Sequence, residues 1–158
     1  MEVSFHSLFL WGMLTHRPHT DIDVITPTLD GTILPGVTRD SCLSLIRAHS
    51  SPSNTFKIPG LSPTTRIHAA ERTITMSEVE KWTKEERLLE AFAVGTAVTV
   101  VPVGRIGVGG LSQDATKEKD LVFPERGLRG SIADGLWETL GAVQTGKMQF
   151  EDWNVTCA

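Results

Sequence analysis

The chain has 158 residues, of which 40% are hydrophobic and 22% are charged, and its formal net charge is −4. This length suits one domain, and the acidic balance argues against a nucleic-acid-binding protein. We also expect no membrane association, because no apolar run is long enough to span a bilayer. Two cysteines, Cys42 and Cys157, provide neither a disulfide framework nor a metal cluster. They favour an intracellular, reducing compartment and packed or surface thiols.

The first predicted elements are two strands, over 7–13 and 21–26, joined by a turn-like segment at 16–19. The first strand is an aromatic-rich apolar run, and the second alternates Ile22, Val24 and Thr26 with aspartates. We expect the two to form a hairpin. The first 14 residues match neither a secretory signal nor an organelle transit peptide, so a cytoplasmic or mitochondrial location is expected.

The next stretch, 26–41, reads Thr-Pro-Thr-Leu-Asp-Gly-Thr-Ile-Leu-Pro-Gly-Val-Thr-Arg-Asp-Ser and leads into a helix predicted over 40–49. Unpaired backbone N–H groups at a helix start, with a partial charge of about +0.5, favour an anion. Gly36 allows close backbone approach and Thr38 adds a hydroxyl donor, so a phosphate is the natural ligand. The alternative is an ordinary loop-to-helix junction with Thr38 as the N-cap.

The predicted helix over 40–49 places Cys42, Leu43, Leu45 and Ile46 on its inward side. A loop is predicted over 50–65 and a strand over 66–75. The Thr75 to Glu78 spacing is that of a capping box, followed by core positions at helical intervals, namely Met76, Val79 and Trp82. The charged residues of 78–87 indicate a solvated helix face.

The last third of the chain is predicted to begin with a helix that ends near Gly95, followed by a buried strand over 98–103. Thr96 and Ala97 lie at that junction. A hairpin is predicted over 106–123, and its glycines at 107–110 lack the context of a dinucleotide-binding turn. A final helix is expected over 131–145, with inward residues Ile132, Leu136, Leu140 and Val143. The fold class is therefore mixed α/β, with paired strands around three main helices.

Two of these stretches resemble one enzyme family. The Leu-Asp-Gly-Thr-Ile-Leu-Pro-Gly-Val-Thr-Arg-Asp segment is similar to the signature loop of branched-chain-amino-acid aminotransferases, which are pyridoxal-phosphate (PLP) enzymes of fold type IV. The segment Glu-Ala-Phe-Ala-Val-Gly-Thr-Ala at 90–97, with Pro-Val-Gly-Arg-Ile after it, resembles a second segment of that family. A thinner resemblance covers Glu2-Val3 before Leu8-Phe9, and Gln144-Thr-Gly-Lys147 before Trp153.

The resemblance implies a set of site residues. The threonine at 96 would meet the cofactor phosphate, and the Thr96-Ala97 turn would offer backbone N–H groups to the substrate carboxylate. The glutamate at 2 would face the pyridine nitrogen and keep it protonated. The alternative is that Glu2 is an ordinary solvated side chain without a role in cofactor binding. Cofactor binding is thus expected from Glu2, Leu34, Gly36, Val37, Thr38 and Thr96, and substrate binding from Thr96 and Ala97.

The family transfers an amino group between an aliphatic amino acid and 2-oxoglutarate, and its members are homodimers. Its cofactor-holding lysine and a ring-contacting tyrosine lie upstream of the pyridine-facing glutamate. This chain has no tyrosine, and none of its lysines, which are Lys57, Lys81, Lys84, Lys117, Lys119 and Lys147, matches that position. The resemblance therefore covers only the C-terminal portion of the enzyme, over 1–158, without the small N-terminal domain, and we expect this chain to be inactive alone.

Two other interpretations stay open. One is a non-catalytic paralogue that binds phosphate or PLP weakly, or that associates with a full-length subunit. The other is a sibling of fold type IV, such as a D-amino-acid aminotransferase or an aminodeoxychorismate lyase, against which the form of the signature loop speaks. A sheet cut in mid-domain would leave unpaired edges, so marginal solubility is also expected.

Overall fold

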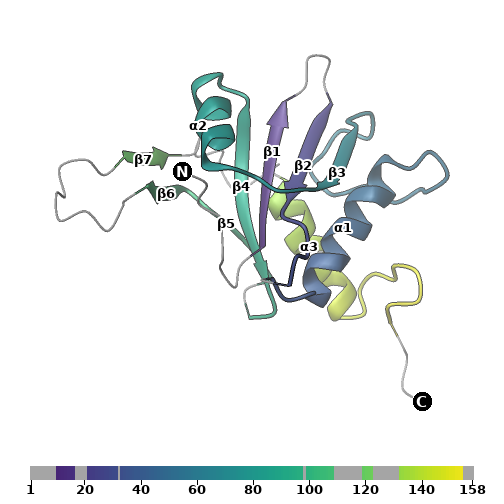
Figure 1. Ribbon diagram of the computed structural model, residues 1–158. Helices are drawn as coiled ribbons and strands as arrows, with labels where there is room; N and C mark the ends of the chain where they lie inside the picture. The colour runs from purple at the N-terminus through teal and green to yellow at the C-terminus, as the bar shows by residue number, and fades with distance from the viewer. Residues whose placement is uncertain are drawn as a thin grey trace.

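The computed structural model describes residues 10–16, 21–31, 33–97, 99–108, 119–122 and 132–154. These residues form helices and strands in a mixed α/β arrangement, which confirms the predicted fold class (Figure 1). In chain order the elements are β1 Leu10–His16, β2 Ile22–Thr26, α1 Val37–Ser50, β3 Ile67–Glu71, α2 Met76–Lys84, β4 Leu88–Gly95, β5 Thr99–Pro102, β6 Arg105–Val108, β7 Lys119–Val122 and α3 Ile132–Gln144.

The main sheet has five strands in the order β3-β2-β1-β4-β5. Strand β1 is antiparallel to both β2 and β4, so those two strands run in the same direction. Strands β2 and β3 are parallel, which requires a crossover, and α1 lies in that crossover. The carboxyl ends of β2, β3 and β4 therefore share one end of the sheet, and α1 begins there (Figure 1).

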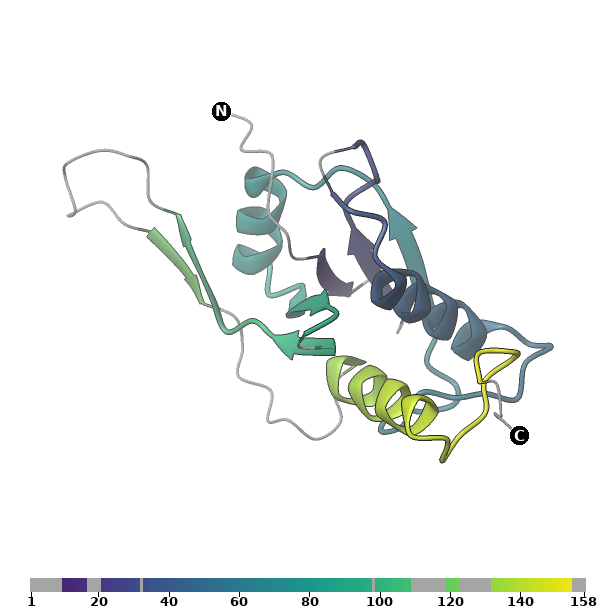
Figure 2. The ribbon, with the colours of Figure 1, turned by 90° about the horizontal axis from the view of Figure 1, so that it is seen from below.

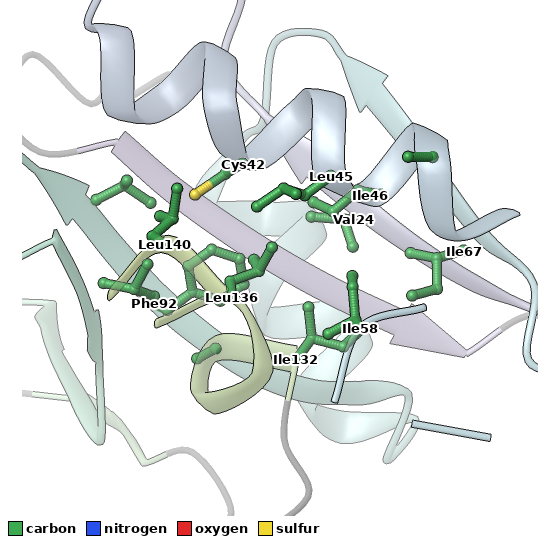
Figure 3. Close-up of a cluster of buried hydrophobic side chains, with 14 of the residues drawn as sticks. Val24, Cys42, Leu45, Ile46, Ile58, Ile67, Phe92, Ile132, Leu136 and Leu140 are labelled. Carbon is green, nitrogen blue, oxygen red and sulfur yellow. The ribbon is translucent and has the colours of Figure 1, made fainter. Parts of the chain in front are cut away.

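The sheet is covered on both faces, with α1 and α3 on one side and α2 on the other (Figure 2). The larger core joins β2 and β4 to the inward faces of α1 and α3, as Val24, Leu45, Phe92, Leu136 and their neighbours show (Figure 3). A second cluster on the opposite face contains Ile25, Ala91, Val79, Trp82, Ile106 and Leu121. Within the described residues, no helix has the length and apolar character needed to cross a membrane.

Several predicted elements are confirmed. Strands β1 and β2 pair as a hairpin, and β6 pairs with β7. The predicted strand residues 7–9 lie outside the described part of the chain, and β1 extends to His16, beyond the predicted end at 13. The predicted inward residues of α1 and α3 are all buried, and Thr75 and Glu78 form the predicted capping box, with the Glu78 N–H donating to Thr75 Oγ1 over 3.3 Å. Val79 and Trp82 are buried, and Met76 packs against them.

The helix predicted before Gly95 is wrong, because Leu88–Gly95 is strand β4. This strand lies between β1 and β5 and is buried on both faces, so its sequence is a nearly continuous apolar run without alternation. Its leucines, alanines and glutamate are good helix formers, and their local preference is overridden by the pairing with two neighbouring strands.

Three boundaries also differ from the prediction. Helix α1 begins at Val37 with Gly36 as its N-cap, so Thr38 lies inside the first turn and is not the cap. Strand β3 ends at Glu71, because the chain beyond it turns into the capping box of α2. Strand β5 spans Thr99–Pro102 at the edge of the sheet, where Val101 is exposed, so the predicted buried strand over 98–103 is only partly buried.

Candidate functional site

The loop over 27–36 connects the carboxyl end of β2 to the start of α1. Its last residue, Gly36, is the N-cap of α1 and makes no side-chain cap hydrogen bond. The first N–H groups of a helix have no acceptor within the helix, and Gly36 has no side chain that could cap them, so we call this start uncapped. This helix start therefore presents backbone donors and the positive end of the helix dipole at the end of the sheet.

Gly36 has unstrained backbone angles and no close neighbour among the described residues at the position of a Cβ. Its φ of −74° and ψ of 135° are accessible to any residue. A Cβ added at this position would approach the Leu34 carbonyl oxygen no closer than 4.0 Å. Neither backbone conformation nor packing within the chain therefore requires glycine here, and the space beside its Cα suits a group that comes close to the backbone.

Two large apolar side chains flank this glycine and point into solvent. Leu34 is 76% exposed and Val37 is 82% exposed, whereas large hydrophobic side chains are usually covered. Leu29, in the same loop, is 45% exposed. Apolar side chains are therefore exposed on both sides of Gly36 in the sequence, and Leu34 is suited to contact the face of a flat apolar ring.

Arg39, in the first turn of α1, forms hydrogen bonds with the start of the loop and with the end of β3. Its Nη2 donates to the Pro27 carbonyl oxygen over 2.9 Å and to Glu71 Oε2 over 2.8 Å. Arg47 donates to the other oxygen of Glu71, also over 2.8 Å. The hydrogen bond and charge of Arg39, with a further contribution from Arg47, lower the pKa of Glu71, so this carboxylate stays ionised at neutral pH.

The sequence interpretation missed Arg39 and Glu71. A signal was present, because a cation in the first turn of a helix faces the positive end of the dipole and needs a compensating partner. The partner could not be identified from the sequence, since Glu71 comes from the end of β3, more than thirty residues away. Only the parallel pairing of β2 with β3 brings the two together.

Thr38 and the Thr96-Ala97 turn occupy the same end of the sheet. Thr38 is half-buried in the first turn of α1, while Thr96 and Ala97 are exposed in the turn that joins β4 to β5. Thr99, which follows this turn, has a φ of 58°, a left-handed conformation that is rare for a β-branched residue. Glu2 lies outside the described residues.

An open hollow of about 1050 Å³ lies between the first turns of α1 and the end of α3. Pro35, Gly36 and Val37 border it on one side, and Leu140, Val143 and Trp153 on the other. Thr38, Thr96 and Ala97 do not line it, so the hollow joins only part of the predicted site. Trp153 is held there by an edge-to-face contact with Phe150, at 4.7 Å between ring centroids.

Cys42, Lys57 and Lys81 do not line this hollow. Burial raises the pKa of the Cys42 thiol to about 12, which makes it a packed core residue and confirms the prediction for this cysteine. Lys57 donates to the His49 carbonyl oxygen at the far end of α1, and Lys81 lies on α2. Among the described side chains, no cluster of three or more His, Cys, Asp or Glu could hold a metal ion.

No family model matches the chain, but curated relatives do. A branched-chain-amino-acid aminotransferase of Monosiga brevicollis is 35% identical over 151 residues, which are 95% of this chain and 32% of the relative. The cytosolic form of Caenorhabditis elegans is 35% identical over 153 residues, covering 96% of this chain and 32% of the relative. The mitochondrial form of Schizosaccharomyces pombe is 36% identical over 133 residues, covering 84% and 27%. The chain is related to the branched-chain-amino-acid aminotransferases.

The similarity to the branched-chain aminotransferases covers nearly all of this chain but only about a third of each relative. The relatives include a cytosolic and a mitochondrial form. The family resemblance seen in the two sequence segments is therefore confirmed.

Proposed function

We propose that this chain is a branched-chain aminotransferase-like protein, corresponding to the C-terminal cofactor domain of the family, and that its loop over 27–36 binds the phosphate of PLP. The observation that carries this proposal is the uncapped start of α1, preceded by a glycine whose Cα faces open space. An anion at a helix start is stabilised by the backbone donors and by the dipole. The relationship to the aminotransferases makes a cofactor phosphate the anion to expect.

The residues present fit this cofactor. The N–H groups of Val37 and Thr38 and the hydroxyls of Thr38 and Thr96 would hold the phosphate, and Leu34 would contact the face of the ring. PLP, when bound, supplies the electron sink for amino-group transfer between an aliphatic amino acid and a 2-oxo acid such as 2-oxoglutarate. The Thr96-Ala97 turn would offer its N–H groups to the substrate carboxylate, and Glu2 would face the pyridine nitrogen. The homodimer of the family is the assembly that we expect.

The test is PLP binding by the purified chain, measured by equilibrium dialysis. Thr38→Ala and Thr96→Ala each remove one hydroxyl donor to a charged acceptor, so each should raise the Kd about ten- to a hundredfold. Thr83→Ala is the matched control, because the Thr83 hydroxyl donates to the Val79 carbonyl oxygen on α2, on the opposite face of the sheet. Absence of PLP binding, or an unchanged Kd in both variants, contradicts the proposal.

A second candidate is a non-catalytic relative that keeps the phosphate loop and associates with a full-length subunit. The exposed side chains of Leu34 and Val37 favour it, because they could contact another subunit. The positions of the lysines also favour it, because none of the described lysines lines the hollow beside the loop. Borohydride reduction in the presence of PLP, followed by mass mapping, separates the two candidates. One pyridoxyl-lysine together with leucine-dependent formation of glutamate would exclude the non-catalytic alternative.

A further inference from the structure

The loop over 27–36 is tied at its beginning by a side chain that comes from just beyond its end. Pro27 is the first residue after β2, and Arg39 is the third residue of α1. The hydrogen bond from Arg39 Nη2 to the Pro27 carbonyl oxygen therefore joins the two ends of the loop across the segment that carries Leu34 and Gly36. Fixing both ends removes conformations that the loop would otherwise sample.

Arg39 is poorly explained as a residue that only stabilises its helix. It is 6% exposed, and it lies at the helix end where a cation is unfavourable. Its Nε atom is buried and finds no hydrogen-bond acceptor among the described residues. Arg39 also lines the hollow, together with Gly36 and Val37.

Glu71 fixes the direction of the Arg39 side chain. Its two carboxylate oxygens accept from different arginines, Oε2 from Arg39 and Oε1 from Arg47. The carboxylate thus compensates the charge of Arg39 and holds its guanidinium toward Pro27 from the end of β3. Arg47 lies near the other end of α1 and is 53% exposed; it donates to the same carboxylate and makes no hydrogen bond to the described residues of the loop.

We propose that Arg39, oriented by Glu71, is a positioning residue that holds the loop in the conformation that binds the cofactor phosphate. This inference rests on the proposed function of the loop. Arg39 acts on the geometry of the binding site: it keeps the helix start, Gly36 and Leu34 in one arrangement before the ligand binds. The conformational entropy of the loop is then lost when the chain folds and not when the ligand binds. The Kd is lower because binding no longer has to order the loop.

The matched pair Arg39→Gln and Arg47→Gln tests this inference in the full chain. Both changes remove one positive charge from α1 and one hydrogen bond to Glu71, but only the first releases Pro27. Backbone ¹⁵N order parameters report loop order, and equilibrium dialysis with PLP reports the Kd. A third variant, Arg39→Lys, keeps the charge but has a shorter side chain that ends short of the position of Nη2, the atom that donates to both acceptors, and it serves if Arg39→Gln does not fold.

We expect order parameters over 28–36 to fall from about 0.85 toward 0.6 in both Arg39 variants, with α3 unchanged, and the Kd for PLP to rise about tenfold or more. Arg47→Gln should change neither quantity by more than about twofold. Unchanged loop order in the Arg39 variants, or an equal effect of Arg47→Gln, overturns the inference. If the unmodified chain does not bind PLP, the proposed function fails, while the order parameters still decide whether Arg39 orders the loop.

Discussion

At the scale of single residues, the candidate site depends on what surrounds Gly36 and Val37. A glycine that is required by its own chain either has a left-handed backbone or is crowded by neighbours, as Gly31 with a φ of 92° illustrates for the first case. Gly36 satisfies neither condition. The sequence predicted a binding role for this glycine, and the structure adds that neither its backbone angles nor its described neighbours require a glycine at this position.

The change Gly36→Ala should therefore weaken ligand binding without unfolding the protein. Alanine is a poorer N-cap than glycine, but it reduces the entropy of the unfolded chain, and these effects offset each other to within about 0.5 kcal/mol. The added methyl group would occupy the space proposed for the phosphate, so the Kd for PLP should rise about tenfold or more. Urea unfolding and equilibrium dialysis measure the two quantities.

Val37→Ala is the matched control, because Val37 would contribute its backbone N–H and its side chain is exposed. It should leave both the unfolding free energy and the Kd nearly unchanged. A larger loss of binding in Val37→Ala than in Gly36→Ala would contradict the assignment of the loop.

At the scale of elements, helix α3 shows how close packing fixes a position that sequence patterns leave open. Gly135 lies where α3 meets the segment 58–59, which precedes β3. A Cβ at this position would lie 2.4 Å from Ile58 Cγ2 and 2.5 Å from the Pro59 carbonyl oxygen. The second of these atoms belongs to the backbone, so it cannot move aside as the end of a side chain could.

Gly135→Ala should accordingly destabilise the fold by about 1–3 kcal/mol, the usual cost of overpacking a core. Gly141→Ala is the control on the same helix, because no atom lies within 4 Å of its added Cβ. That change should stabilise the chain by up to about 1 kcal/mol, through the higher helix propensity of alanine. Urea unfolding of the two variants checks the prediction, and equal effects of both changes would refute the proposed clash.

Helices were predictable where their apolar positions repeat at helical spacing, and β4 was not. In α3 the residues Ile132, Leu136, Leu140 and Val143 give that spacing, and all are buried. In β4 the apolar run is too short and too continuous to have a period, because the strand is covered on both faces. The segment 51–65 lacks regular structure as expected, whereas Ser50 belongs to α1. Its buried Ile58 and partly buried Phe56 gave no periodic signal of their packing.

At the scale of the whole molecule, the candidate site is produced by topology. Three separate parts of the sequence contribute to it: the start of α1 with Arg39, Glu71 at the end of β3, and the Thr96-Ala97 turn after β4. They share one end of the sheet because β2, β3 and β4 run in the same direction. The family resemblance predicts Thr38 and Thr96 as site residues, since it carries residue identities. It could not identify Glu71, whose role depends on a strand pairing that no local motif encodes.

The opposite end of α1 carries a buried histidine that should make the stability of the whole fold depend on pH. His49 is 1% exposed, and its Nδ1 accepts from the Ile58 N–H over 2.9 Å, while its Nε2 lies 3.2 Å from the Thr65 carbonyl oxygen. Because Nδ1 is an acceptor, the ring is neutral with its proton on Nε2. Burial lowers the pKa of His49 below its usual 6.5, against the opposing hydrogen bond to Thr65 and with a further contribution from Lys57.

In the folded state His49 therefore takes up a proton only at a pH below the value for the unfolded chain. Its contribution to stability is fully present above about pH 6.5, and it is lost as the pH falls, at up to about 1.4 kcal/mol per pH unit, until the folded pKa is reached. Protonation of Nδ1 would also break the hydrogen bond that holds Ile58.

Urea unfolding between pH 5 and pH 8 should show this decrease in the free energy of unfolding of the unmodified chain. His49→Gln should be less stable at pH 8 and should lose most of the pH dependence, whereas His68→Asn, at a half-exposed position beside Asp21, should retain it. An equal pH dependence in the unmodified chain and in His49→Gln would show that another group is responsible.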